Sequence, residues 1–261
     1  MVSLSLTRQF FSLFVDILKA FDVADQRPLY VQISRYGVRF YSSYASVMVA
    51  RADFRRDLFV KFEVGDETTS FGLNVGRWVE LVSVFGKFSV GVDMLIDEDA
   101  QLVTKLVSED SVHTVSVTIN TLDIEEPVLD LGFDSSSLKA TAAAQPPLMA
   151  KALAQLSSLP FQTILSFNSG SLKIDCGSVC VIRKSPHIDA LAVTGSGECS
   201  FAYRGDLFRK ALKPLSKVGI LHMVRVRVDE SGILQVLYFF KALPEGLFFE
   251  ISLIPEVGEL S

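Results

Sequence analysis

Asp123-Ile124-Glu125-Glu126-Pro127 lies near the middle of the 261-residue chain, and it is polar and acidic, unlike the apolar stretches on either side of it. Such a composition is typical of a linker. On each side the sequence predicts the same order of elements, namely a helix, a run of strands, a second helix and three more strands, which indicates two copies of one unit of about 125 residues. We therefore expect an N-terminal unit at 1–121, a connector at 122–136 and a C-terminal unit at 137–261.

Helical spacing of apolar side chains occurs in only four stretches of the sequence. Asn74 is a good N-cap residue for the second stretch, and Pro146 suits the first turn of the third. Pro160 and Pro214 are placed to end the third and fourth stretches. The sequence predicts helices at 8–20, 74–87, 146–157 and 204–213.

Short segments with period-two alternation fill the rest of the chain, and tight-turn signals such as Arg35-Tyr36-Gly37 join them. Such turns favour antiparallel meanders over parallel crossovers, so the predicted fold class is α+β. Gly195-Ser196-Gly197 is expected in a hairpin loop. The predicted strands are 29–34, 38–42, 46–52, 59–64, 68–73, 91–96, 102–107, 112–121, 161–167, 171–175, 178–183, 200–203, 220–228, 233–240 and 247–254.

The overall composition is that of a chain with a large core: 49% of the residues are apolar, 21% are charged and the mean hydropathy is +0.36. A disordered chain is therefore excluded. We expect no membrane span and no secretory signal, because no long uninterrupted apolar run occurs and no charged segment precedes one at the N-terminus. Three cysteines fit a reducing compartment, the cytosol or the nucleus.

Positive charge is concentrated in the four predicted helices. They hold nine basic and three acidic residues, a net charge of +6, which leaves −11 for the rest of a chain whose net charge is −5. Basic helices on an acidic protein suit a polyanionic partner. The alternative is that these side chains only keep the helix faces solvated.

Other chemistry has weaker support in the sequence. Cys176 and Cys180 are poorly spaced for zinc, and Asp97, Glu98 and Asp99 are more simply explained as a solvated turn. His113, His187 and His222 are isolated, and no phosphate-binding loop or nucleophile elbow is present. We therefore expect a non-catalytic protein without a metal or cofactor.

Several segments resemble the eukaryotic sliding clamps typified by proliferating cell nuclear antigen, and among these most of all the Rad-one subunit family of the DNA-damage checkpoint clamp. These segments are 42–47, 71–75, 81–86, 119–121, 125–126, 212–217, 224–229, 232–234 and 249–256. The resemblance implies two tandem clamp units with antiparallel sheets outside and four helices lining the inner face.

From the resemblance we expect a nuclear subunit of a heterotrimeric checkpoint clamp. It would form a ring with two other clamp-like subunits around double-stranded DNA, without sequence specificity, and would engage a clamp loader, repair proteins and signalling proteins. A homotrimeric replicative clamp is the first alternative. A metal-dependent DNA exonuclease is the second, and it would need convergent carboxylates.

The same resemblance implies three sets of site residues. The DNA-facing set is thinner than in the replicative clamp, since Glu80 and Ser83 stand where that clamp has lysines; its members here are Lys19, Arg77, Lys151, Arg209, Lys210 and Lys213. The subunit interface would use two edge strands through Val115, Val117, Ile119 and Val181. The apolar partner-peptide pocket would comprise Phe40, Leu122, Ile124, Ile233, Leu253 and Pro255.

Overall fold

The computed structural model is mixed helix and sheet, with far more strand than helix. It describes residues 2–20, 28–85, 89–96, 101–108, 114–127, 130–154, 162–168, 170–176, 179–183, 191–195, 198–215, 221–240 and 247–256. None of the helices in these ranges has the length and apolar character of a transmembrane segment. The predicted α+β class is therefore confirmed.

All four predicted helices are present: α1 (Arg8–Ala20), α2 (Val75–Phe85), α3 (Pro146–Ala154) and α4 (Gly205–Leu212). Asn74 caps α2 as expected, because its Oδ1 accepts a hydrogen bond from the backbone N–H of Arg77 at 3.1 Å. The apolar stripe of α1 is buried, with Phe14, Ile17 and Leu18 each no more than 3% exposed.

The strands follow the sequence-based prediction closely, with three additions. Their bounds are β1 (Val2–Thr7), β2 (Leu29–Ser34), β3 (Gly37–Tyr44), β4 (Met48–Arg55), β5 (Lys61–Glu63), β6 (Thr69–Leu73), β7 (Ser89–Ile96), β8 (Gln101–Ser108), β9 (Thr114–Asn120), β10 (Leu138–Ala144), β11 (Gln162–Asn168), β12 (Ser171–Asp175), β13 (Val179–Arg183), β14 (Leu191–Gly195), β15 (Cys199–Arg204), β16 (Leu221–Asp229), β17 (Leu234–Phe240) and β18 (Leu247–Leu253).

The additions are β1, β10 and β14, which the sequence analysis did not predict. The expected hairpin around Gly195-Ser196-Gly197 is wrong. The strands on either side of it belong to different sheets, because β14 pairs with β10 and β15 pairs with β11. Long-range pairing therefore decides the position of this segment, and local turn chemistry does not.

The chain divides into two compact units. Unit 1 consists of Met1–Ser42, Arg51–Pro127 and Leu243–Phe248, and unit 2 of Ser43–Ala50, Val128–Ala242 and Phe249–Ser261. Since each unit takes segments from both halves of the sequence, the boundaries at 121 and 137 stay a prediction.

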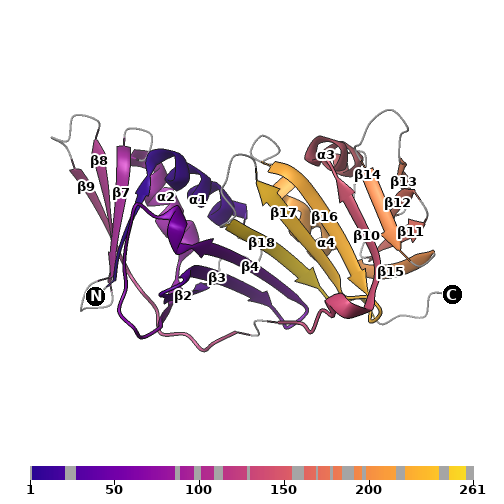
Figure 1. The fold of residues 1–261 in the computed structure, drawn as a ribbon, viewed down its shortest axis with the longest axis horizontal. Helices are drawn as coiled ribbons and strands as arrows, with labels where there is room; N and C mark the ends of the chain where they lie inside the picture. Colours follow the sequence, from indigo (N-terminus) through magenta and orange to yellow (C-terminus); the bar gives the residue numbers. More distant parts are fainter. Residues whose placement is uncertain are drawn as a thin grey trace. The chain divides into compact units, whose positions relative to one another are not determined.

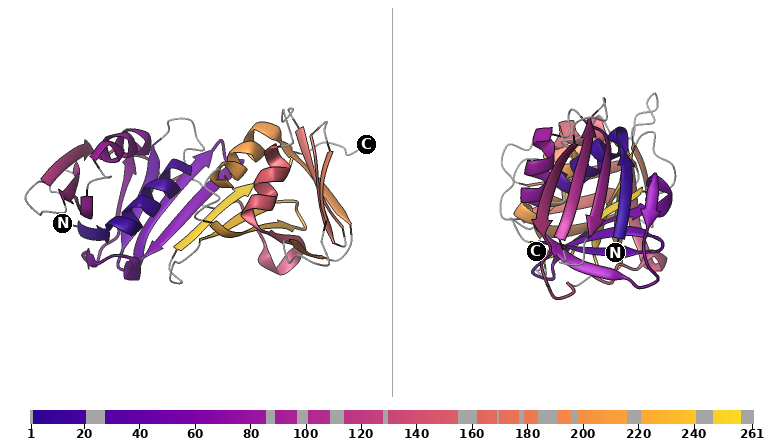
Figure 2. Two further views of the ribbon diagram at one scale, coloured as in Figure 1. Left: turned by 90° about the horizontal axis from the view of Figure 1, so that it is seen from above. Right: turned by 90° about the vertical axis from the view of Figure 1, so that its left-hand side faces the viewer.

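The described residues of unit 1 include strands of two antiparallel sheets and the helices α1 and α2 (Figure 1). One sheet has the order β5-β1-β7-β8-β9, and the right-hand view of Figure 2 looks onto it. The other contains β3, β2 and β6 in that order, with β4 next to β3. Phe14 of α1 packs against Phe40 of β3 and Phe54 of β4, so the core lies between this helix and this sheet.

In unit 2, one sheet contains β14-β10-β16-β17-β18 in that order, and another has the order β13-β12-β11-β15. Two buried tyrosines fix its elements together. Tyr203 of β15 donates a hydrogen bond to the carbonyl oxygen of Gly232 at 2.8 Å, and Tyr238 of β17 donates one to the carbonyl oxygen of Ala211 at the end of α4. Both hydroxyls are satisfied, as buried polar groups must be.

Candidate nucleic-acid and partner interfaces

Five of the six side chains predicted to face DNA lie in the described part of the chain. Arg77 is exposed on α2, Lys151 is exposed in the last turn of α3, Arg209 is exposed and Lys210 half-buried on α4, and Lys213 is exposed directly after α4. Lys19 belongs to α1, but its side chain lies outside the described residues.

The observed helix bounds reduce the positive charge of the helices. Within these bounds there are six basic and three acidic residues, a net charge of +3, because Arg204 and Lys213 flank α4 and Lys87 lies outside the described residues. On α2, Glu80 is exposed near Arg77, and Leu81 and Val84 are 36% and 61% exposed. Arg77 and Glu80 give α2 no net charge, and apolar side chains make up part of its exposed side.

The basic character of α4 lies in its last turn. At its start, Arg204 binds Asp206 through two nitrogens at 2.8 and 3.2 Å, and these hydrogen bonds raise the pKa of Arg204. Arg209 and Lys210 lie in the last turn, where cations complement the helix dipole. The Lys210 ammonium stands 5.0 Å from the centre of the Tyr44 ring, within cation–π range.

β9 forms one edge of its sheet in unit 1, since it pairs with β8 and is last in the strand order. Val117 and Ile119 are 7% and 8% exposed, while Ser116 and Thr118 on the other face are exposed. These two apolar side chains therefore contribute to the core of unit 1. What β9 offers to a neighbouring chain is its backbone edge, together with the half-buried Val115.

β13 forms the corresponding edge in unit 2. It pairs with β12, with Val181 opposite Lys173, and it is last in the order β13-β12-β11-β15. The side chain of Val181 lies outside the described residues.

The connector contacts β6 of unit 1 through Leu122 and Ile124. The backbone N–H and carbonyl of Leu122 exchange hydrogen bonds with Gly72 of β6, at 2.9 and 2.7 Å. Ile124 packs closely over Gly72: a Cβ added at residue 72 would stand 2.9 Å from the Ile124 side chain. Leu122 is 39% exposed and Ile124 half-buried, so both present apolar surface beside the exposed Glu125 and Glu126.

Three of the predicted pocket residues belong to unit 2. Ile233 and Leu253 are 8% and 1% exposed. Pro255 is half-buried, and the segment around it is held by a hydrogen bond from the backbone N–H of Glu256 to the carbonyl oxygen of Ala202 at 2.8 Å. Of these three residues, Pro255 offers the most surface.

Phe40 does not offer its ring to a partner. It is 3% exposed, and its ring centre lies 5.4 Å from that of Phe14 and 5.7 Å from that of Phe54. These contacts place Phe40 in the core of unit 1, on the side of the sheet covered by α1. It is therefore left out of the proposed peptide-binding surface.

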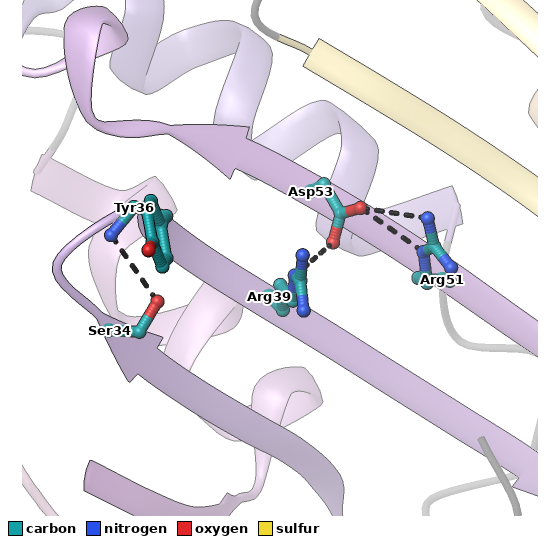
Figure 3. Close-up of polar contacts among 5 residues, drawn as sticks. All are labelled: Ser34, Tyr36, Arg39, Arg51 and Asp53. Atoms are coloured by element: carbon teal, nitrogen blue, oxygen red, sulfur yellow. Dashed lines mark hydrogen bonds and ion pairs between the residues drawn. The ribbon is translucent and has the colours of Figure 1, made fainter. Parts of the chain in front are cut away.

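The opposite face of the same sheet carries an ion cluster that the sequence analysis did not single out (Figure 3). Asp53 of β4 binds Arg39 of β3 at 3.1 Å and Arg51 of β4 at 3.0 Å. Arg39 and Asp53 are the sequence neighbours of Phe40 and Phe54, so strand alternation points them away from the core. Tyr41 lies nearby; burial raises its pKa and Arg39 lowers it in part.

The candidates for catalysis show no convergence within the described ranges. Cys176 is buried, and burial raises the pKa of the half-buried Cys199 thiol. His222 is exposed on β16. The described residues contain no group of three or more metal-ligating side chains. His113, His187 and the acidic run Asp97, Glu98 and Asp99 lie outside the described residues.

Among known protein families, the sequence model described as repair protein Rad1/Rec1/Rad17 matches residues 3–240 of the 261-residue chain. No curated protein matches the sequence significantly.

Proposed function

We propose that the chain is one of three different subunits of a ring around DNA. It belongs to the Rad1/Rec1/Rad17 family of clamp-like repair proteins, and this membership supports a role as a checkpoint clamp subunit. The family match covers most of the chain and carries the assignment to DNA-damage checkpoint and repair. The ring itself is an inference from the sheet edges.

The two edge strands support the ring. β9 of unit 1 and β13 of unit 2 end their sheets, and pairing between unlike edges of successive chains is a heterologous contact. A heterologous contact closes into a ring when the rotation between chains allows it. The buried side chains of Val117 and Ile119 leave backbone hydrogen bonding as the main attraction at β9.

We assign DNA contact to the basic side chains of the helices. A closed ring holds DNA by encirclement, so each helix needs only weak attraction to phosphates, without reading the bases. The net helix charge of +3, with no net charge on α2, suits weak contact. In this proposal three unlike subunits share the positive lining unevenly.

The ring would recruit clients and act in the nucleus with a clamp loader. For client binding we propose the apolar surface of Leu122 and Ile124 on the connector, beside the carboxylates of Glu125 and Glu126. An aromatic side chain anchored there would supply the buried centre that short-motif binding needs. No observation in the described residues favours the exonuclease alternative, so it is not proposed.

The encirclement claim is tested with the assembled complex loaded on nicked circular DNA bound to beads. Linearising the circle with a restriction enzyme should release the complex, because a sliding ring leaves through a free end. Blocking the ends with a bulky protein should restore retention. Equal retention on open linear and circular DNA would contradict a topological hold.

A further inference from the structure

We propose that the outer face of the unit 1 sheet, at Arg39, Arg51 and Phe248, is a docking site for an acidic peptide segment of a partner protein that carries a large apolar side chain among its carboxylates. We call this surface the arginine site. It lies wholly within unit 1, and it uses neither the helices nor the edge strands assigned to the ring.

The charge of the arginine site is opposite to that of the chain as a whole. Residues 35–57 hold five arginines and two aspartates, a net charge of +3, while the whole chain carries −5. At the centre, one carboxylate, Asp53, faces the two guanidinium groups of Arg39 and Arg51. The formal net charge of these three side chains is therefore +1 (Figure 3).

The arginines are held in place while remaining accessible. The side chains of Arg39 and Arg51 are 50% and 34% exposed, whereas that of Asp53 is only 19% exposed. The Arg51 guanidinium also stands 5.1 Å from the centre of the Phe248 ring. Two fixed planar groups of this kind are suited to bind a carboxylate with paired hydrogen bonds.

A hollow of about 320 Å³ adjoins the arginines and gives the site an apolar part. Its lining includes Ser34, Tyr36, Arg39, Asp53, Arg55 and Phe248. Small-ligand sites begin at roughly 300 Å³, so the hollow has room for one large side chain but not for a folded domain. Tyr36 is 64% exposed, and the Arg35 guanidinium lies 4.8 Å from the centre of its ring.

The turn that carries Tyr36 is pinned against the end of β4. The backbone N–H of Arg56 donates a hydrogen bond to the Tyr36 carbonyl oxygen at 3.0 Å. At Gly37 a Cβ would stand 2.1 Å from the carbonyl oxygen of Phe54, so only glycine permits this close approach. Because the turn that carries Tyr36 is held in place before a peptide binds, binding requires little ordering of the protein.

An acidic peptide fits this surface better than a nucleic acid does. Duplex DNA is bound by rows of cations that neutralise several phosphates in succession. Here the positive charge is gathered beside a single hollow with an aromatic wall. That combination suits a short segment with a few carboxylates and one apolar anchor.

The test uses the full chain and a fluorescent ten-residue peptide in which one phenylalanine is flanked by glutamates, with binding followed by anisotropy at low salt. A matched peptide has glutamine in place of glutamate. The variant Arg39→Gln with Arg51→Gln should weaken binding of the acidic peptide about tenfold or more, since charged hydrogen bonds are lost. The glutamine peptide should bind weakly to every form of the chain.

Two further double variants test the role of guanidinium geometry and control for the loss of positive charge elsewhere. Arg39→Lys with Arg51→Lys preserves charge and partners for Asp53 but removes the planar forks, so it should show a smaller loss of affinity. Arg225→Gln with Lys61→Gln is the control, because Arg225 stands 5.3 Å from the Phe239 ring in unit 2 and Lys61 pairs with Glu63, both outside the site. This control should bind like the parent chain.

Unchanged affinity in both arginine double variants would overturn the proposal. So would equal binding of the glutamate and glutamine peptides, or displacement of the peptide by an equally charged DNA oligonucleotide at lower concentration. The assay needs neither the ring nor DNA loading, so its failure leaves the proposed clamp role intact.

Discussion

Trp78 on α2 donates a hydrogen bond from its indole Nε1 to the Oγ1 of Thr104 on β8, across 2.9 Å, and the two residues are 1% and 0% exposed. The bond joins the second helix of unit 1 to the strand that pairs with the edge strand β9. It thereby links the helix that carries Arg77 to the strand next to β9.

Replacing Thr104 with valine should lower the free energy of unfolding by about 1–3 kcal/mol, because the indole N–H is left buried without an acceptor while side-chain volume hardly changes. Urea denaturation followed by tryptophan fluorescence measures the loss. Thr118→Val, at an exposed position of β9, is the matched control and should change stability little. Equal stability of Thr104→Val and the parent chain would show that this bond contributes nothing.

Stability should fall in alkaline solution because of two buried tyrosines. Burial raises the pKa of Tyr203 and of Tyr238 well above the ordinary value, which is about 10 in the unfolded chain. Their stabilising contribution is complete below about pH 10 and declines as the pH rises toward the folded-state pKa, by up to about 1.4 kcal/mol per pH unit for each group. Urea unfolding between pH 8 and 11 follows this decline.

The variant Tyr238→Phe should show a shallower decline above pH 10 than the parent chain. At neutral pH it should lose only the hydrogen bond to Ala211, about 1 kcal/mol. Identical alkaline slopes in variant and parent would mean that Tyr238 does not control this behaviour.

Two glycine substitutions distinguish an effect on the connector from an effect on the stability of α2. Gly72→Ala places a Cβ 2.9 Å from the Ile124 side chain, so it should loosen the connector and speed amide hydrogen exchange at Leu122. Gly76→Ala on α2 meets nothing closer than 3.9 Å and should stabilise the helix by up to about 1 kcal/mol. If Gly72 holds the connector in place for client binding, Gly72→Ala should speed amide hydrogen exchange at Leu122 and Gly76→Ala should not.

Charge reversal on the helices tests DNA contact by this subunit. In the assembled ring, Arg77→Glu, Lys151→Glu, Arg209→Glu and Lys213→Glu together should shorten retention on circular DNA at low salt without changing assembly. Each lost phosphate contact should reduce the slope of log affinity against log salt by about 1. Lys61→Glu with Lys139→Glu, on β5 and β10, is the control. If the fourfold variant is retained on DNA as long as the parent, these side chains do not contact DNA and only keep the helix faces solvated.

The helices were predictable from sequence because each carries an apolar stripe with clear boundaries, such as Asn74 before α2. β10 was missed because Leu138–Ala144 is rich in alanine, which has low strand propensity. Its place depends on pairing with β14 and β16. The predicted hairpin at Gly195 failed for the same reason, since local turn signals do not specify which sheet a strand joins.

The site residues divide in a similar way. Arg77, Lys151 and Arg209 were named from the resemblance to the clamp family, and all three are exposed. The burial of Phe40 and the cluster of Arg39, Arg51 and Asp53 depend on the register between β3 and β4 and on which face α1 covers. No short-range pattern gives that register. The five arginines between residues 35 and 57 do show in the sequence that positive charge is concentrated there.

The heterotrimeric ring is tested by the native mass of the assembly that co-purifies with the tagged chain from its own cells, together with the mass of the purified chain alone. We expect one copy of this 28.7 kDa chain with two different clamp-family chains, and a monomer in isolation. An assembly that contains three copies of this chain and no other subunit would contradict it and would favour a homotrimeric clamp.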